Sequence, residues 1–291
     1  MGKYFSKEKN KTTKPCINSH EVFSRSYESK DDYNEGEHYI HIATRDIFKV
    51  NFSSDIQNVL LNPNTKILDV GCGFGFWLTE MASDFPKPSY FGIDILPIYP
   101  KSTFPNNITF QQHDILKRLP FEDNSFDFIH IQFLNFDITE LQWETIVFQE
   151  LARILKPGGW LEFCEMEYGI LNYGPLSKQF DLTMINYLRT RNVNPQIILR
   201  SHSILKSIPS FSSSHIHHKR RKFPVGSYKN QLEELCAKNT KHQVKSLLKG
   251  QIGKDMNVKK GDVDSITDKI VKEFETNKSY FYIHRIYVQK H

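Results

Sequence analysis

The sequence has no apolar run near the length of a membrane-spanning helix, which needs about 20 residues. Its first residues are polar and lack the apolar stretch of a secretory signal. We therefore expect an intracellular protein. The cytoplasm is its expected location, and a membrane surface and the nucleus are the alternatives.

Cysteine is scarce, with 4 residues in a chain of 291, and no two of them form a C-x-x-C pair. The four are Cys16, Cys72, Cys164 and Cys236. This spacing argues against a zinc site and against a disulfide framework, so we expect reduced thiols. No carboxylate or cysteine lies near His215, His217 and His218 in sequence, and no metal is expected there either.

Charge of one sign does not dominate, because the net charge is only +5 at pH 7. Basic residues gather in two places, at residues 3–14 and in the run HIHHKRRK at residues 215–222. Either cluster could bind nucleic acid, but a small positive net charge is also common in proteins that do not bind it. Nucleic acid is therefore not the expected partner, and the second cluster is interpreted as a solvated sheet edge.

The hydrophobic content of 39% is that of an ordinary globular protein, and it is unevenly distributed. Residues 1–20 are polar and without periodicity, which predicts a disordered basic tail. Residues 21–291 are predicted to form one domain. It begins with an irregular lead-in over residues 21–38 and helical pieces from 39 to 61.

Short apolar runs then alternate with helical patterns, which is typical of parallel βαβ units. The predicted strands are 66–70, 90–95, 108–112, 126–132 and 160–167. Helices are expected at 75–84 and 139–155, the second ending at the turn residues 156–159. Later helices are predicted at 176–191, 197–207, 229–248 and 262–275, with strands at 213–222 and 280–289. The helices around residues 170–210 are interpreted as a cap inserted into an α/β doubly wound domain.

The first predicted strand runs into Asp69 and the loop Gly71-Cys72-Gly73-Phe74-Gly75. Glycines permit backbone angles closed to other residues and let a ligand approach the main chain. The loop opens a helix, whose N-terminal N–H groups favour a negative group such as the carboxylate of a methionine moiety. Cys72 is expected to be a small packing residue, because no basic neighbour lowers its pKa.

Two further acids follow at the ends of the next strands. Asp94 lies 19 residues beyond Gly75, the distance expected for a carboxylate that binds ribose hydroxyls. Asp114 lies 20 residues further on, where it can accept a hydrogen bond from an adenine amine. The dinucleotide alternative requires a small residue at the sixth loop position, and Phe76 stands there. The pattern therefore favours S-adenosylmethionine over a nicotinamide or flavin cofactor.

Four segments resemble the successive motifs of class I S-adenosylmethionine-dependent methyltransferases: ILDVGCGFG (67–75), FGIDILP (91–97), HDILKRLPFEDNSFDFIH (113–130) and ELARILKPGGWLEF (150–163). With residues 51–73 and 282–290 included, the chain is most similar to fungal methyltransferases related to regulators of secondary metabolism. The resemblance implies a Rossmann-like, doubly wound seven-stranded sheet of order 3-2-1-4-5-7-6. Its last strand would be antiparallel, and helices would cover both faces.

The resemblance also implies a role for individual residues. Asp69, Gly71 and Gly73 would lie beside the methionine part of the cofactor. Asp94 would bind the ribose, and Gln132 would lie beneath the sulfonium. The full predicted cofactor-binding set is Asp69, Gly71, Cys72, Gly73, Gly75, Asp94, Ile95, Asp114, Ile115 and Gln132.

The methyl acceptor is less defined. The protein must hold an acceptor atom in line with the methyl group, about 3–3.5 Å away. The acceptor-side candidates are Gln132, Asn135, Asp137, Glu165, Glu167 and Tyr168, and none is assigned as a catalytic residue. Glu165 and Glu167 share one strand face, so both could point into the crevice, with solvated residues at a strand end as the alternative. His130 is interpreted as a sheet residue.

Several possibilities for the acceptor stay open. Gln132-Phe133-Leu134-Asn135 replaces the Asn/Asp-Pro-Pro motif of enzymes that methylate nucleobase amines, which counts against that class. A small molecule and a protein both remain as acceptors. A methyltransferase-fold regulator that binds cofactor or partners without significant catalysis is the alternative function.

The N-terminus fits the N-myristoylation pattern M-G-x-x-x-[ST], with Gly2 as the acylated residue and Ser6 at the last position. The lysines that follow would supply the second, electrostatic signal that a single acyl chain requires. Weak membrane association is therefore a hypothesis, with an ordinary solvated tail as the alternative. An intact mass from a native host that shows no acyl chain would exclude it.

Overall fold

The computed structural model describes residues 30–211, 213–226 and 230–291. The predicted tail and the myristoylation pattern at Gly2 lie outside these residues. Within the described part of the chain, no helix is both long and apolar enough to cross a membrane.

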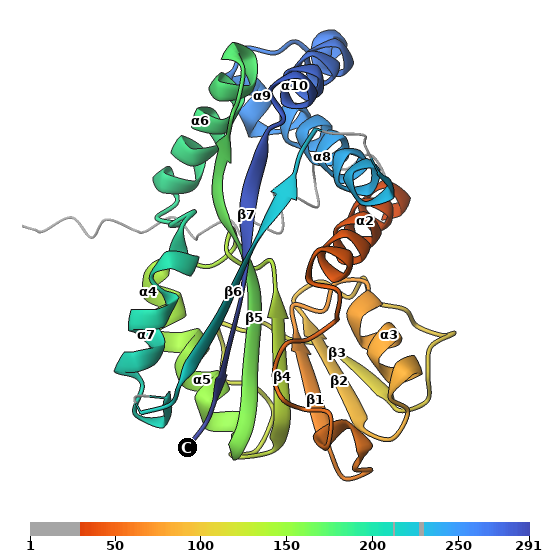
Figure 1. The fold of residues 1–291 in the computed structure, drawn as a ribbon, viewed down its shortest axis with the longest axis vertical. Helices are drawn as coiled ribbons and strands as arrows, with labels where there is room; N and C mark the ends of the chain where they lie inside the picture. The colour runs from red at the N-terminus through yellow and green to blue at the C-terminus, as the bar shows by residue number, and fades with distance from the viewer. Residues whose placement is uncertain (1–29, 212, 227–229) are drawn as a thin grey trace, which may run out of the picture.

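Seven strands form one sheet in the order β3-β2-β1-β4-β5-β7-β6, as predicted (Figure 1). The strands are β1 (Lys66–Val70), β2 (Ser89–Asp94), β3 (Ile108–Gln112), β4 (Phe126–Gln132), β5 (Leu155–Leu171), β6 (Ile216–Pro224) and β7 (Tyr280–Gln289). β1 to β5 pair in parallel, and β7 runs antiparallel to both β5 and β6. The predicted Rossmann-like topology, with its antiparallel last strand, is confirmed.

Helices cover both faces of the sheet because the central strands are apolar on both sides. On one face, α3 (Phe76–Asp84) packs on Ile67 and Phe128. On the other face, α5 (Phe148–Ile154) and α7 (Ser201–Ser207) pack on Leu68 and Ile129. The short α4 (Glu140–Gln142) and a π turn (Trp143–Val147) precede α5, and 3-10 turns lie at Val59–Leu61, Ile197–Leu199, Pro209–Phe211 and Lys260–Asp262.

A helical cap stands over the carboxyl ends of the parallel strands (Figure 1). It contains α6 (Pro175–Thr190), in the range expected for a cap. After β6, α8 (Gln231–Lys249), α9 (Gln251–Asp255) and α10 (Val263–Asn277) join it, and their buried side chains share one core with those of α6. The cap therefore draws on two separate segments of the chain, whereas the sequence placed it in the first alone.

The helix α2 (Lys30–Phe48) replaces the irregular lead-in that was expected up to residue 38. Its apolar stripe consists of Ile40, Ala43 and Ile47, at helical spacing and only in its second half. The polar first half carried no periodic signal. α2 packs against α8 and so connects the sheet to the cap.

β5 begins earlier than predicted, because Leu155 pairs with Phe126 and the strand continues through the turn residues 156–159. Gly158 N–H donates to Lys290 O (2.8 Å), and Lys290 N–H donates to Gly159 O (2.9 Å). The turn residues are thus held by the chain beyond β7, a long-range contact that local propensity cannot reveal.

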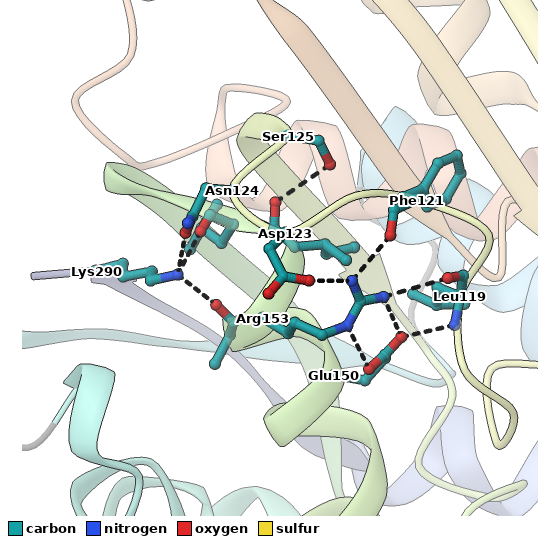
Figure 2. Close-up of polar contacts among 11 residues, drawn as sticks. Leu119, Phe121, Asp123, Asn124, Ser125, Glu150, Arg153 and Lys290 are labelled. Carbon is teal, nitrogen blue, oxygen red and sulfur yellow. Dashed lines mark hydrogen bonds and ion pairs between the residues drawn. The ribbon is translucent and has the colours of Figure 1, made fainter.

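Arg153, at the end of α5, fixes the loop that leads into β4 (Figure 2). Its Nη1 donates to Phe121 O (2.8 Å) and to Asp123 Oδ1 (2.7 Å), and its Nε donates to Glu150 Oε2 (2.9 Å). Lys290 Nζ donates to Asn124 Oδ1 (2.7 Å) in the same network. These contacts lie at the amino end of β4, so this part of the 113–130 motif supports the fold, and ligands of such sheets bind at the carboxyl ends.

Candidate functional site

The glycine loop after β1 is fastened to the next strand by backbone hydrogen bonds. The N–H groups of Gly71 and Cys72 both donate to Ile93 O, at 2.8 and 3.0 Å. Gly71 and Gly73 have φ of +71° and +51°, which side chains rarely adopt. A Cβ on Gly71 would come within 2.6 Å of Leu134, whereas one on Gly73 would find only Glu37 Oε2, at 3.9 Å. The loop therefore leaves its backbone accessible on the side of Gly73.

Asp94 at the end of β2 holds this loop from the other side. Its carboxylate is 3% exposed and accepts from Gly73 N (2.9 Å) through Oδ2 and from Leu96 N (2.8 Å) through Oδ1. Asp94 thus positions the loop, and it also lines the hollow on either side of it.

Two adjoining hollows surround these residues. The first lies above the glycine loop, and the second is lined by Ile95, Asp114 and Ile115. Both hollows are lined by Gly71, Asp94, Leu134 and Asp137. The structure brings nine of the ten predicted cofactor-binding residues to these hollows: Asp69, Gly71, Cys72, Gly73, Asp94, Ile95, Asp114, Ile115 and Gln132.

Gly75 is the exception, because it lines neither hollow. It caps the N-terminus of α3 with φ of +74°, and a Cβ there would come within 2.6 Å of Phe110. Its glycine serves the start of the helix and its packing on β3, and its place in the ligand-binding set stays a prediction.

His130 lines the first hollow, although the sequence suggested only a sheet residue. Its Nδ1 lies 2.8 Å from Asp69 Oδ1, and the two residues are register partners on β4 and β1. The ring stacks on Trp77, with centroids 4.0 Å apart and planes at 4°. His130 Nε2 is buried and has no hydrogen-bond partner among the described residues. A polar atom in that state is costly unless a ligand or water pairs with it.

Of the acceptor-side candidates in the loop after β4, Gln132 and Asp137 line the first hollow, and Asn135 does not. Asn135 is buried, and its Nδ2 donates to Met166 O (3.0 Å). The Nδ2 group thus joins this loop to β5, whereas Oδ1 is buried and has no hydrogen-bond partner among the described residues. Because Asn135 does not line the hollow, the structure does not bring it to the acceptor side as expected.

Glu165 and Glu167 also point away from the hollow. Glu165 is buried and accepts from Leu134 N (2.8 Å) and Asn135 N (3.2 Å), and burial raises the pKa of its carboxyl to about 8. Glu167 accepts from Arg220 Nη2 (2.7 Å) and lies 2.8 Å from the Nε2 atom of His284.

The other face of β5 lines the hollow instead, through Met166, Tyr168 and Ile170. The sequence correctly put the two glutamates on one face, but alternation cannot say which face meets the ligand. Of the two alternatives for the glutamates, the one that points them into the crevice is therefore excluded.

Other lining residues lie on helices that sequence reasoning did not connect with the site. α2 contributes Glu37, Ile40 and His41, and α3 contributes Phe76 and Trp77. His41 and Arg45 lie one helical turn apart on a face of α2 that meets an acid of α3. That acid is Glu80 on α3, whose Oε2 lies 2.6 Å from His41 Nε2 and whose Oε1 pairs with Arg45.

We expect Glu80→Gln to lower the free energy of unfolding by about 1–2 kcal/mol at pH 7. The hydrogen bond with His41, followed by that with Arg45, lowers the pKa of Glu80 to about 2 in the folded protein. A carboxyl with a depressed folded pKa stabilises the fold above its unfolded pKa and loses that contribution as the pH falls towards 2. Urea unfolding should therefore separate the two proteins at pH 7 and bring them together near pH 2. An equal gap at both pH values would contradict this assignment.

No metal centre forms in the described part of the chain, where no three His, Cys, Asp or Glu side chains gather around a common point. In the HIHHKRRK run, His218 Nε2 lies 2.8 Å from His284 Nδ1. His215 and His217 are ring neighbours at 4.5 Å.

Residues 67–159 match the protein family described as "Methyltransferase domain". Methyltransferase str3 of Strobilurus tenacellus is 34% identical over 103 residues, which are 35% of this chain and 36% of that protein. The secondary metabolism regulator laeA of Coprinopsis cinerea is 27% identical over 147 residues, which are 50% of this chain and 35% of that protein. The chain thus spans about a third of the length of these relatives.

Among solved structures, phosphoethanolamine N-methyltransferase 2 of Haemonchus contortus in complex with S-adenosyl-L-methionine is similar, with 16% identity and a TM-score of 0.49. The alignment covers 86% of this chain and 56% of that one.

Proposed function

Because the chain contains a class I S-adenosylmethionine-dependent methyltransferase domain related to the fungal laeA-like proteins, we propose that it transfers a methyl group from this cofactor to an acceptor molecule. The observation that carries the proposal is one hollow that is lined on two sides. The glycine loop and the ends of β1, β2 and β4 form its floor, and the cap forms its roof. A donor and an acceptor can therefore meet inside it.

The residues present fit S-adenosylmethionine. The accessible backbone at Gly73 leaves room beside the first turn of α3, whose N–H groups suit a carboxylate. Asp94 lines both hollows and is the carboxylate that would bind the ribose hydroxyls, and Asp114 lines the second hollow with Ile95 and Ile115, where the adenine would lie. His130 Nε2 is buried and has no hydrogen-bond partner among the described residues, and it lies beside the place expected for the methionine part of the cofactor.

When bound, the cofactor supplies an electrophilic methyl group on a sulfonium. The new bond forms between the acceptor's lone pair and the methyl carbon, while the electrons of the broken carbon–sulfur bond stay on sulfur. An acceptor atom that carries a proton releases it to water, directly or through a side chain of the hollow. The chain's own contribution is to bind both molecules, align them and exclude water.

The test is calorimetry with S-adenosylmethionine, S-adenosylhomocysteine and NAD, followed by transfer of labelled methyl groups in cell extracts. We expect both adenosyl compounds to bind and NAD not to bind. Binding of NAD alone would overturn the proposal.

A regulatory protein without significant catalysis is the second candidate, because one relative is named as a regulator of secondary metabolism. It would bind the cofactor in the same experiment and transfer no label to any component of the extract. The open hollow beyond the cofactor residues supports the enzyme over this alternative.

A further inference from the structure

The roof of the hollow differs chemically from its floor. The lining from β5 and the cap includes Met166, Tyr168 and Ile170 of β5, Phe180 and Met184 of α6, and Val244 of α8. The acidic and histidine side chains of the lining all come from α2, from the ends of β1, β2 and β4, or from the loop after β4: Glu37, His41, Asp69, Asp94, His130 and Asp137. Within the described residues, the cap half of the hollow therefore contains no charged side chain.

A charged acceptor would lose its hydration in the cap half without gaining a partner. Moving an ion into such surroundings costs several kcal/mol. Apolar surface, in contrast, gains on leaving water for the same walls. The rings of Phe136 and Tyr168 meet edge to face, with centroids 5.2 Å apart, and add aromatic surface against which a ring or conjugated chain can pack.

Three polar side chains of α8 interrupt this apolar lining, namely Asn239, Thr240 and the less buried Gln243. Asn239 of α8 is 4% exposed and lines the hollow. Its Oδ1 has no hydrogen-bond partner among the described residues. The hydroxyl of Thr240 beside it is already used, since it donates to Cys236 O at 2.9 Å. An amide oxygen in this state can only accept, so the group that it lacks is an O–H or N–H donor.

We infer that the acceptor is an uncharged, largely apolar small molecule with a hydroxyl or N–H group that donates to Asn239 Oδ1. This inference rests on the proposed function, because it names the substrate class of the same hollow. Asn239 is a positioning residue: its hydrogen bond fixes the orientation of the acceptor, and the apolar walls supply most of the affinity.

The experiment uses three probes that share one ring system: 1-naphthol, naphthalene and 1-naphthyl phosphate. The full chain is first saturated with S-adenosylhomocysteine, so that the probes meet only the acceptor half, and binding is followed by fluorescence. We expect 1-naphthol to bind about three- to tenfold more tightly than naphthalene, the range of one net hydrogen bond. The phosphate should bind at least tenfold more weakly than 1-naphthol.

Two variants connect these differences to the structure. Asn239→Leu, which keeps the shape of the side chain, should bring 1-naphthol and naphthalene to equal affinity. Val244→Phe fills the cap half and should weaken 1-naphthol and naphthalene together by at least tenfold. Thermal unfolding and affinity for S-adenosylhomocysteine verify that each variant is folded.

Three outcomes would overturn the inference: no binding of 1-naphthol, binding of the phosphate as tight as that of 1-naphthol, or a preference for 1-naphthol that survives in Asn239→Leu. The proposed function fails separately, if S-adenosylhomocysteine does not bind the parent protein. In that case the same titrations without it still test the apolar pocket.

Discussion

Replacing Asp94 with alanine should weaken binding of S-adenosylmethionine by about 1.5–3 kcal/mol, or roughly 10- to 150-fold. The ribose hydroxyls of the cofactor would lose the carboxylate that accepts their hydrogen bonds. The substitution also removes the acceptor for Gly73 N and Leu96 N, so the glycine loop loses one of its two anchors. The effect should therefore lie near the upper end of this range.

Calorimetry on both proteins measures this difference. Asp84→Ala is the matched control, because Asp84 is an exposed residue of α3 that lines neither hollow. It should bind the cofactor like the parent protein. Equal affinity of the Asp94 variant and the parent would refute the assignment of the ribose site.

Replacing Glu162 with alanine should lower the free energy of unfolding by about 3–5 kcal/mol. Glu162 and Arg285 are 0% and 1% exposed, with 3.4 Å between Oε1 and Nε. Glu162 Oε2 also accepts from Ser54 N (2.7 Å), Ser54 Oγ (2.6 Å) and Ser53 N (2.8 Å). Removing this carboxylate leaves a buried guanidinium and several donors without their partner.

The same pair holds the connection between α2 and β1. Arg285 Nη1 donates to Val50 O (3.0 Å), and its guanidinium lies 4.2 Å from the ring centre of Phe48, the last residue of α2. We therefore expect the Glu162 variant to lose cofactor affinity as well, because α2 would no longer be held over the glycine loop.

Urea unfolding followed by circular dichroism measures the stability change. Glu144→Ala, at an exposed position of the π turn before α5, is the control and should change stability by less than about 0.5 kcal/mol. A loss below about 1 kcal/mol in Glu162→Ala would show that the ion pair does not organise this region.

The sheet could be predicted closely from the sequence. β1, β3, β4 and β7 have the predicted bounds, because each is rich in β-branched, aromatic or other apolar residues and follows turn residues. Asp94 was identified by its distance from the glycine loop, and the structure places it against that loop. In each case the signal is contained in a few neighbouring residues.

The buried polar pairs could not be predicted in the same way. Asp69 and His130 are 61 residues apart, and only the pairing of β1 with β4 brings them to 2.8 Å. Glu162 and Arg285 are likewise joined by strands β5 and β7. A titratable residue inside a strand gives no indication of its partner until the strand order is fixed.

The sequence by itself determined the strands, the glycine loop and the acids at the strand ends, because local propensity and spacing encode them. Only the tertiary structure decided which face of β5 meets the ligand, and it turned Met166 and Tyr168 inward and the two glutamates away. It also decided that α2, α8 and α10 close the hollow. Both outcomes depend on packing between segments far apart in the chain, which local propensity and spacing do not record.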